Sequence, residues 1–273
     1  MGKFDGILIC TDLDGTLFKN DKTVSRENRE AIEYFKREGG YFTFITGRMP
    51  YYSKEAYNAA KPNVPFGCVN GGALYDGDGE KYVWWQEMPD GFLPLIEAID
   101  KKFKNVGIQI CTFHKTYFAK ENDTMLNFRR VTGLPNLTAD YHEICEPVGK
   151  VIFGTNIEEE IIAVEKTLRN HPLAEKYDFI RSERTLFEIL PKGVNKGLAL
   201  KKLVDYLNIN PEKTIAVGDY NNDVGMFLSA KLGIAVANAS KAALEAADLV
   251  TVSNEEHAIA RIIYDIEDGK ILN

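Results

Sequence analysis

Two carboxylates follow directly on an apolar run near the start of the chain. The run Ile7–Cys10 leads into TDLDGTLF, which places Asp12 and Asp14 two residues apart beside Gly15. A buried strand does not end in two acids for reasons of packing, because an ionised carboxylate is costly to bury without a partner. Carboxylates can bind a hard cation, attack an electrophile or carry a proton. The stretch therefore indicates chemistry rather than packing.

Two other apolar runs, Tyr41–Ile45 and Thr214–Val217, also lead into polar residues. These residues are Thr46, Gly47 and Arg48 after the first run, and Gly218, Asp219, Asn222 and Asp223 after the second. Lys196 stands at the start of a segment with helical periodicity. Four acids, two cations, a hydroxyl and several glycines thus stand directly after an apolar run or at the start of a helical segment.

The elements that must position these residues alternate between strand and helix patterns. Strands are predicted over 7–11, 41–45 and 66–69, with a helix over 25–38 that Ser25 caps. The alternation returns after Gly193. There we expect helices over 195–207, from about 221, over 240–246 and at the C-terminus, and strands over 214–217, 233–237 and 249–252. Strand–helix–strand repeats with short connections predict a parallel sheet in an α/β fold. Ligands bind beyond the carboxyl ends of such strands, so the polar residues are expected to converge there.

The middle of the chain has a different pattern. Residues 73–85 have the pattern of a hairpin, with DGDGE as its turn. The segment that follows mixes helices with paired short strands. Helices are expected over 91–103, 121–132 and 157–169, and strand pairs over 107–112 with 115–119 and 177–182 with 185–190. We therefore predict a discontinuous α/β domain, residues 1–85 and 191–273, with an α+β domain inserted at 86–190.

Each of these residues has a simpler interpretation when it is taken alone. DLDG could begin a calcium loop, but Thr16 and Leu17 stand where that loop needs an oxygen ligand and a glycine. Asp12 or Asp223 could cap a helix, and Lys196 could be a solvated lysine. None of these interpretations explains why all of the residues fall at one edge of the predicted sheet.

Several carboxylates at one place repel one another and must take up protons or bind a cation. Oxygen ligands with room left for water and a phosphate oxygen favour Mg²⁺ over Ca²⁺. Backbone N–H groups at Gly47, the Thr46 hydroxyl and the Lys196 ammonium would complete a phosphate cradle, to which Asn222 could also donate. The residues therefore predict Mg²⁺-assisted phosphate chemistry.

Composition narrows the possible partners. The chain has 273 residues, 45% apolar and 27% charged, with a net charge of −7, which argues against a nucleic-acid-binding surface. No apolar run approaches the roughly 20 residues that a membrane helix needs. The four cysteines are widely spaced and form no CxxC pair. We expect a cytoplasmic protein that acts on a small metabolite, without nucleic-acid or membrane partners.

Four motifs in order resemble those of the haloacid dehalogenase superfamily of phosphatases, in particular its Cof-type, sugar-phosphatase-like branch. They are DLDGT (12–16), ITGR with Thr46, NKG with Lys196, and GDYNND (218–223). NGG (70–72) and VANAS (236–240) are also similar to this branch, whereas Tyr220 and Gly225 depart from it. The resemblance implies a Rossmann-like, doubly wound parallel sheet with an inserted α+β cap domain.

The resemblance also implies roles for the residues. Asp12 would be the nucleophile that forms an aspartyl-phosphate, and Asp14 the general acid and base. Asp12, the Asp14 backbone carbonyl and Asp219 would hold Mg²⁺, with Asp223 as a further ligand or as support for one. The implied activity is hydrolysis of phosphate monoesters of small metabolites, such as sugar phosphates.

Two alternatives stay open at this point. A phosphomutase would use the same nucleophile but return the phosphoryl group to its substrate. A non-catalytic metabolite-binding protein would keep the fold, although no expected catalytic residue is missing here. The sequence does not identify the substrate, the specificity residues of the cap or the oligomeric state.

Overall fold

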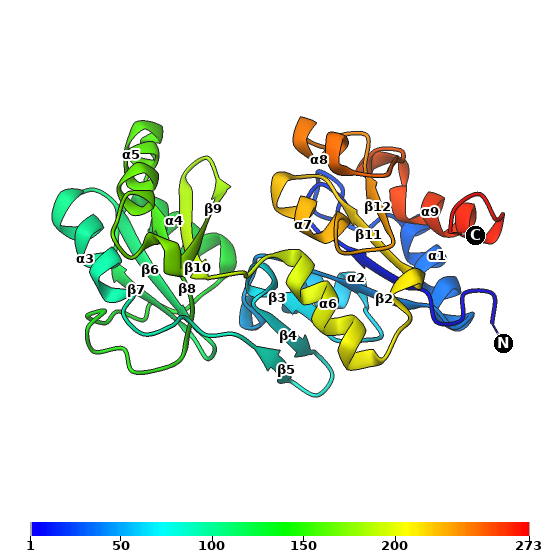
Figure 1. Cartoon of the computed structure of the whole chain (residues 1–273), viewed down its shortest axis with the longest axis horizontal. Helices are drawn as coiled ribbons and strands as arrows, with labels where there is room; N and C mark the ends of the chain where they lie inside the picture. Colours follow the sequence, from blue (N-terminus) through cyan, green and yellow to red (C-terminus); the bar gives the residue numbers. More distant parts are fainter. Residues whose placement is uncertain (1, 273) are drawn as a thin grey trace. The chain divides into compact units, whose positions relative to one another are not determined.

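The computed structural model in Figure 1 describes residues 2–272. The chain divides into two compact units: the α/β unit runs up to Trp85 and resumes at Asn195, and the inserted unit spans Gln86–Val194. The chain re-enters the α/β unit after Val194, whereas the sequence suggested a boundary after residue 190. Lys192 and Gly193 belong to the inserted unit because both bond to the Asp178 carboxylate, at 2.8 Å and 2.7 Å.

A parallel sheet of five strands lies at the centre of the α/β unit, in the order β13-β12-β11-β1-β2. All of its pairings are parallel, as predicted. The strands are β1 (Leu8–Thr11), β2 (Tyr41–Phe44), β11 (Thr214–Gly218), β12 (Leu232–Ala235) and β13 (Leu249–Val250). Every residue of β1 and β11 is buried, which explains their short, continuous apolar runs. The predicted α/β fold class is confirmed.

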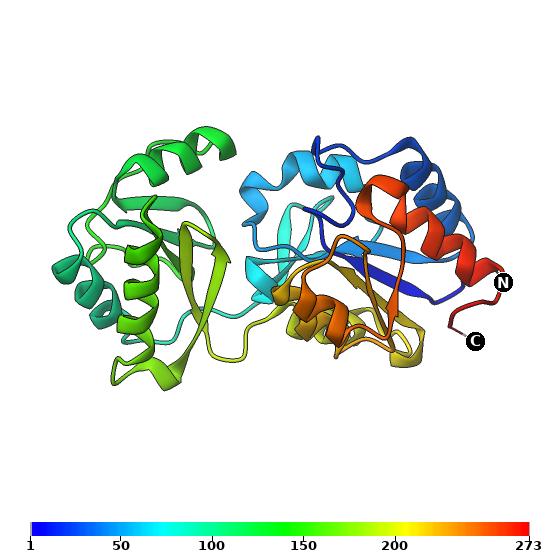
Figure 2. The same ribbon diagram turned by 90° about the horizontal axis from the view of Figure 1, so that it is seen from above.

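Helices cover both faces of this sheet. Figure 2 shows α1 and α9 (blue and red) on one face and α6 and α8 (yellow and orange) on the other. The helices of this unit are α1 (Arg26–Arg37), α2 (Lys54–Ala60), α6 (Lys196–Leu207), α7 (Val224–Phe227), α8 (Lys241–Ala246) and α9 (Ala258–Glu267). The Ser25 hydroxyl accepts the Asn28 N–H at 3.1 Å, which confirms the predicted cap of α1.

The third predicted strand does not join the parallel sheet. β3 (Phe66–Cys68) pairs antiparallel with β4 (Ala73–Asp76), which pairs with β5 (Lys81–Trp85) in a separate three-stranded sheet. One parallel bridge, Ile45 to Gly67, ties β3 to the end of β2. The chain reverses immediately after Cys68, so β3 extends into the hairpin β4–β5 rather than into a crossover helix.

The inserted unit is an antiparallel sheet of five strands in the order β7-β6-β8-β10-β9. The strands are β6 (Gly107–Thr112), β7 (Thr116–Lys120), β8 (Val148–Gly154), β9 (Tyr177–Glu183) and β10 (Leu186–Pro191), and the helices are α3 (Leu93–Lys102), α4 (Asp123–Thr132) and α5 (Glu158–Arg169). Both predicted strand pairs are confirmed. The central strand β8 was not predicted, because its sequence VGKVIFG contains two glycines and a lysine although all seven residues are buried.

That lysine belongs to a buried ion pair on the inserted sheet. The Lys150 ammonium on β8 lies 2.7 Å from the Glu188 carboxylate on β10, and their side chains are only 3% and 4% exposed. The pair lets two charged residues occupy adjacent central strands.

Among the described residues, no helix is both long enough and apolar enough to cross a membrane.

Breaking the buried pair should destabilise the protein strongly. Lys150→Met leaves the Glu188 carboxylate buried without its cation, so we expect the free energy of unfolding to fall by about 3–5 kcal/mol in urea titrations. The double substitution Lys150→Met with Glu188→Leu should recover most of this loss. As a matched control, Lys241→Met breaks an exposed pair with Glu245 and should change stability by at most about 1 kcal/mol. Equal losses in the two single variants would contradict this account.

Candidate active site

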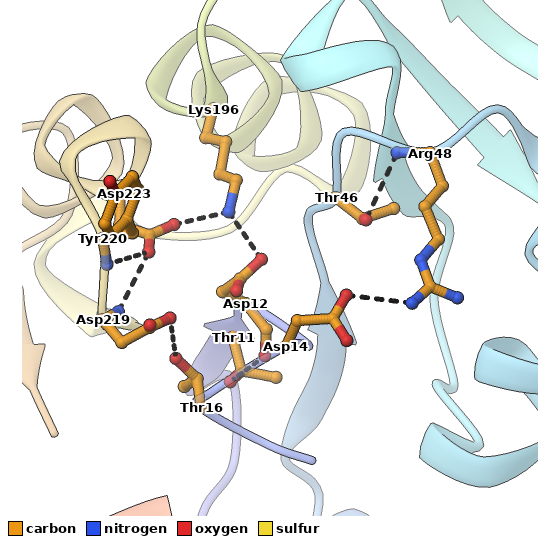
Figure 3. A network of polar contacts seen from close by, with 10 residues as sticks. All are labelled: Thr11, Asp12, Asp14, Thr16, Thr46, Arg48, Lys196, Asp219, Tyr220 and Asp223. Carbon is orange, nitrogen blue, oxygen red and sulfur yellow. Dashed lines mark hydrogen bonds and ion pairs between the residues drawn. The ribbon is translucent and has the colours of Figure 1, made fainter. Parts of the chain in front are cut away.

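The carboxyl ends of β1, β2 and β11 bring the predicted residues together. Asp12 follows β1, Thr46 follows β2 and Asp219 follows β11, and Figure 3 shows the side chains converging. The Asp12 N–H donates to the Val217 carbonyl at 2.8 Å. The parallel register of neighbouring strands thus determines where each of these loops leaves the sheet.

Three carboxylates form a cluster at this edge. Asp12, Asp219 and Asp223 each offer an oxygen that lies within 4.8 Å of those of the other two. The Thr16 hydroxyl donates to Asp219 Oδ1 at 2.9 Å, which fixes one oxygen of that residue. Sequence reasoning assigned no role to Thr16, although its place in DLDGT could have suggested one. The cluster is of the type that holds a divalent cation.

Lys196 is the cation within this cluster. Its Nζ lies 2.5 Å from Asp12 Oδ1 and 2.5 Å from Asp223 Oδ1, and its side chain is 2% exposed. Burial disfavours the charged ammonium, but the two carboxylates outweigh burial and raise the pKa of Lys196 above its usual value. Asn195 caps α6 by accepting the Leu198 N–H at 3.1 Å, and this cap fixes where the helix begins.

Asp223 connects the lysine to the loop after β11. Its Oδ2 accepts the backbone N–H groups of Asp219 and Tyr220, both at 2.9 Å, while its Oδ1 faces Lys196. The side chain is completely buried. Asp223 therefore holds the loop that carries Asp219 as well as contributing a carboxylate to the cluster.

The charges of the cluster are unbalanced, because three carboxylates face one ammonium. Burial, followed by the neighbouring carboxylates Asp223 and Asp219, raises the pKa of Asp12 to about 7 against the opposing effect of Lys196. Burial and Asp223 raise the pKa of Asp219 to about 6. Carboxyl groups whose ionisation is disfavoured in this way gain from a bound cation. The donor set therefore fits a hard divalent metal ion.

Asp14 lies apart from this cluster. Its carboxylate is directed toward Arg48, whose Nη2 lies 2.9 Å from Oδ2 (Figure 3). Lys22 Nζ lies 2.9 Å from Oδ1. Burial alone would raise the pKa of Asp14, but the two cations outweigh it and lower that pKa. No sequence motif pointed to Lys22, which lies in an exposed turn.

The remaining predicted phosphate contacts lie on two loops. The Thr46 hydroxyl is almost completely buried and accepts the Arg48 N–H at 3.3 Å, with Gly47 between them. Asn222 is half-buried in the turn Asn221–Asp223. The roles of Thr46, Gly47 and Asn222 toward phosphate stay predictions.

The model of the haloacid dehalogenase-like hydrolases matches residues 9–263, which is most of the chain and includes all of the site residues. The chain belongs to the haloacid dehalogenase-like hydrolases. The family predicted from the four motifs is thereby confirmed.

Relatives of known structure and activity agree with this assignment. The 5-amino-6-(5-phospho-D-ribitylamino)uracil phosphatase YitU of Bacillus subtilis is 28% identical over 260 residues, which cover 94% of this chain and 96% of the relative. A haloacid dehalogenase-like hydrolase from Bacteroides thetaiotaomicron is 25% identical, with a TM-score of 0.84 over 95% of this chain and 99% of that one. The subclass IIB sugar phosphatase BT4131 shares the fold, with a TM-score of 0.80 at 21% identity over 95% and 99% of the two chains. The present chain, like its named relatives, is a phosphatase of this family.

The cluster predicts how metal and pH affect stability. The pKa values of Asp12 and Asp219 lie above their ordinary values, so the folded state keeps protons that the unfolded state loses between about pH 4 and pH 7. When EDTA removes bound cations, the raised pKa values of Asp12 and Asp219 therefore make the folded state less stable as the pH rises through this range. Millimolar Mg²⁺ should therefore raise the melting temperature more at about pH 8 than at about pH 5.

The control for this measurement is Asp219→Asn, which removes one carboxylate of the cluster. Its Mg²⁺-induced shift at the higher pH should be smaller than that of the wild type. An equal Mg²⁺ effect at both pH values, or one that Asp219→Asn leaves unchanged, would contradict a metal site at this cluster.

Proposed function

We propose that this phosphatase hydrolyses phosphate monoesters of small metabolites through an aspartyl-phosphate intermediate, in a Mg²⁺-dependent reaction. The observation that carries the proposal is the cluster of Asp12, Asp219 and Asp223 around Lys196. One carboxylate of the cluster would react with phosphorus, and the others would remain to bind the cation that offsets the charge of the phosphoryl group.

Asp12 would supply the nucleophilic oxygen. An Asp12 oxygen forms a bond to phosphorus while the bond from phosphorus to the substrate oxygen breaks, which gives an aspartyl-phosphate and an alkoxide. Water then attacks the same phosphorus and releases inorganic phosphate and the free Asp12 carboxylate. Lys196, which contacts Asp12 Oδ1, would keep this carboxylate oriented and, together with a bound cation, would favour its ionised form.

Asp14 would move the protons. It gives a proton to the leaving alkoxide and takes one from the attacking water, so its protonation is restored at the end of the cycle. In the structure Arg48 and Lys22 favour its ionised form, which is the form required of the base. A phosphate dianion bound beside Asp14 would favour the protonated form that the first step needs.

The residues that would hold Mg²⁺ are Asp12 and Asp219, with the Asp14 backbone carbonyl and with Asp223 as a further ligand or as support. When bound, Mg²⁺ supplies positive charge that polarises the phosphoryl oxygens. Thr46, Gly47, Lys196 and Asn222 would bind the remaining phosphoryl oxygens by hydrogen bonds and charge.

Sugar phosphates or chemically similar metabolites are the proposed substrates. The Bacillus subtilis relative is named for a substrate with a phosphorylated ribityl group, and this supports a small polyhydroxylated leaving group. The inserted unit would serve as the cap that contributes contacts to this group and excludes water. We retain a cytoplasmic location as a prediction from the sequence. A phosphomutase would have to keep water away from the aspartyl-phosphate so that the phosphoryl group returns to the substrate, and no feature of the described residues favours that reaction over hydrolysis.

The role of Asp12 is tested by Asp12→Asn. The amide is a poor nucleophile, so we expect kcat for 4-nitrophenyl phosphate to fall by about 10⁴-fold or more at saturating Mg²⁺. Asp5→Asn changes an exposed aspartate just before β1, at the amino end of that strand, and should leave kcat unchanged. Substantial turnover by Asp12→Asn would exclude this residue as the nucleophile.

The role of Asp14 is tested by comparing rate with binding. Asp14→Asn cannot transfer a proton, so kcat should fall by about 10²–10⁴-fold, while the affinity for orthovanadate should change by no more than about threefold. Steady-state kinetics and vanadate inhibition measure the two effects separately. Equal losses of affinity and rate would show that Asp14 binds phosphate rather than transferring protons.

A further inference from the structure

The turn that ends β3 has an unusual backbone. Val69, Asn70 and Gly71 have φ angles of +54°, +55° and +97°. A positive φ is uncommon for residues other than glycine, and it is a clear outlier for a β-branched residue such as Val69. Val69 and Asn70 are buried, with exposed fractions of 0% and 2%. Strain of this kind persists only where the surrounding structure imposes it, and it is concentrated at functional sites.

One side of this turn holds the loop after β2. The Val69 N–H donates to the Arg48 carbonyl at 3.0 Å, and the Asn70 N–H donates to the Thr46 carbonyl at 3.1 Å. The left-handed conformation of Val69 orients the following peptide group, whose N–H belongs to Asn70, toward this loop. The backbone on either side of Gly47 is therefore fixed by the strained turn.

The other side of the turn contacts the start of α6. A Cβ atom on Gly71 would lie only 2.0 Å from the Asn195 carbonyl oxygen and 2.9 Å from the Lys196 Cα. The next residue of this helix start is equally close to α7, because a Cβ on Gly197 would lie 2.1 Å from the Gly225 carbonyl oxygen. The start of α6 thus packs tightly against the turn through Gly71 and against α7 through Gly197.

We propose that the turn Val69–Gly71 is a positioning element that sets the place of Lys196 relative to Thr46. The inference rests on the proposed function, in which both residues contact the phosphoryl group. Lys196 reaches Asp12 and Asp223 at 2.5 Å each, so a displacement of the helix start would change the geometry of both contacts. A misplacement of about 1 Å at a reacting centre can reduce a rate by about 10²-fold. The positive φ angles of this turn thus occur where it contacts both the loop after β2 and the start of α6.

The decisive variant is Gly71→Ala, whose added methyl group would push the start of α6 away from the turn. We expect kcat/KM for 4-nitrophenyl phosphate to fall by about 10²-fold. The affinity for orthovanadate should fall with it by at least about tenfold, because Lys196 would be displaced in the resting enzyme as well. Circular dichroism and the melting temperature report whether the variant remains folded.

Gly6→Ala is the matched control. Gly6 also has a positive φ, of +75°, but a Cβ atom there would meet only the Lys213 side chain at 3.6 Å, an ordinary contact. It precedes β1, at the end of the strand opposite to Asp12. The control variant therefore carries the same kind of backbone strain without the clash, and we expect a smaller loss of melting temperature with unchanged kcat/KM and vanadate affinity.

A milder pair of variants keeps the proposal testable if Gly71→Ala does not fold. Asn70→Gly and Asn70→Ala both remove the polar side chain. Of these two replacements, glycine adopts a φ of +55° without strain, whereas alanine does not. If the backbone conformation positions the two loops, kcat/KM should be about tenfold lower for Asn70→Ala than for Asn70→Gly. Equal values in the two variants would overturn the proposal.

The outcomes separate this inference from the proposed function. A wild type that turns over phosphate esters, with Gly71→Ala folded and equally active, contradicts the positioning role alone. An equal kinetic loss in Gly6→Ala also contradicts it, because general destabilisation would then explain the effect. A wild type that neither hydrolyses 4-nitrophenyl phosphate nor binds orthovanadate contradicts the proposed function, and the positioning role falls with it.

Discussion

The buried ammonium of Lys196 is the interaction on which the site depends. It lies 2.5 Å from carboxylate oxygens of both Asp12 and Asp223, which come from loops at the ends of two neighbouring strands. Without this cation the carboxylates would repel one another in a place where burial already disfavours their ionised forms. One ammonium does not balance three carboxylates, however. The remaining negative charge makes the site suited to a divalent cation and, with that cation present, to a phosphoryl group.

Much of the α/β unit is arranged to hold this lysine against these carboxylates. The parallel register of β1 with β11 fixes where Asp12 and Asp219 leave the sheet. Asp223 bonds to the backbone of its own loop, and the Asn195 side chain determines where α6 begins. Charge and geometry are therefore linked, because each backbone contact keeps a charged group at the distance that the electrostatic balance requires.

The sequence allowed the sheet and the gathering of the acidic residues to be predicted, because both depend on local patterns. Buried parallel strands appear as short apolar runs, and the carboxyl ends of such strands meet at one edge. Other features depend on partners that are distant in the sequence. β3 had the pattern of a parallel strand, but the reversal at Val69–Gly71 places it in a separate sheet. β8 was missed because Lys150 has the character of an exposed residue until Glu188 is placed beside it. The contact of Lys22 with Asp14 likewise follows from the fold rather than from any motif.

If Asp12 is the nucleophile, it becomes covalently phosphorylated during turnover. The most direct measurement is to quench the enzyme with acid during steady-state hydrolysis of 4-nitrophenyl phosphate, reduce acyl phosphates with borohydride and identify the modified residue by peptide mass spectrometry. The account predicts that Asp12 alone among the aspartates is reduced to homoserine, and only when substrate and Mg²⁺ are both present. Active turnover with Asp12 unmodified, or with the label on another carboxylate, would contradict it.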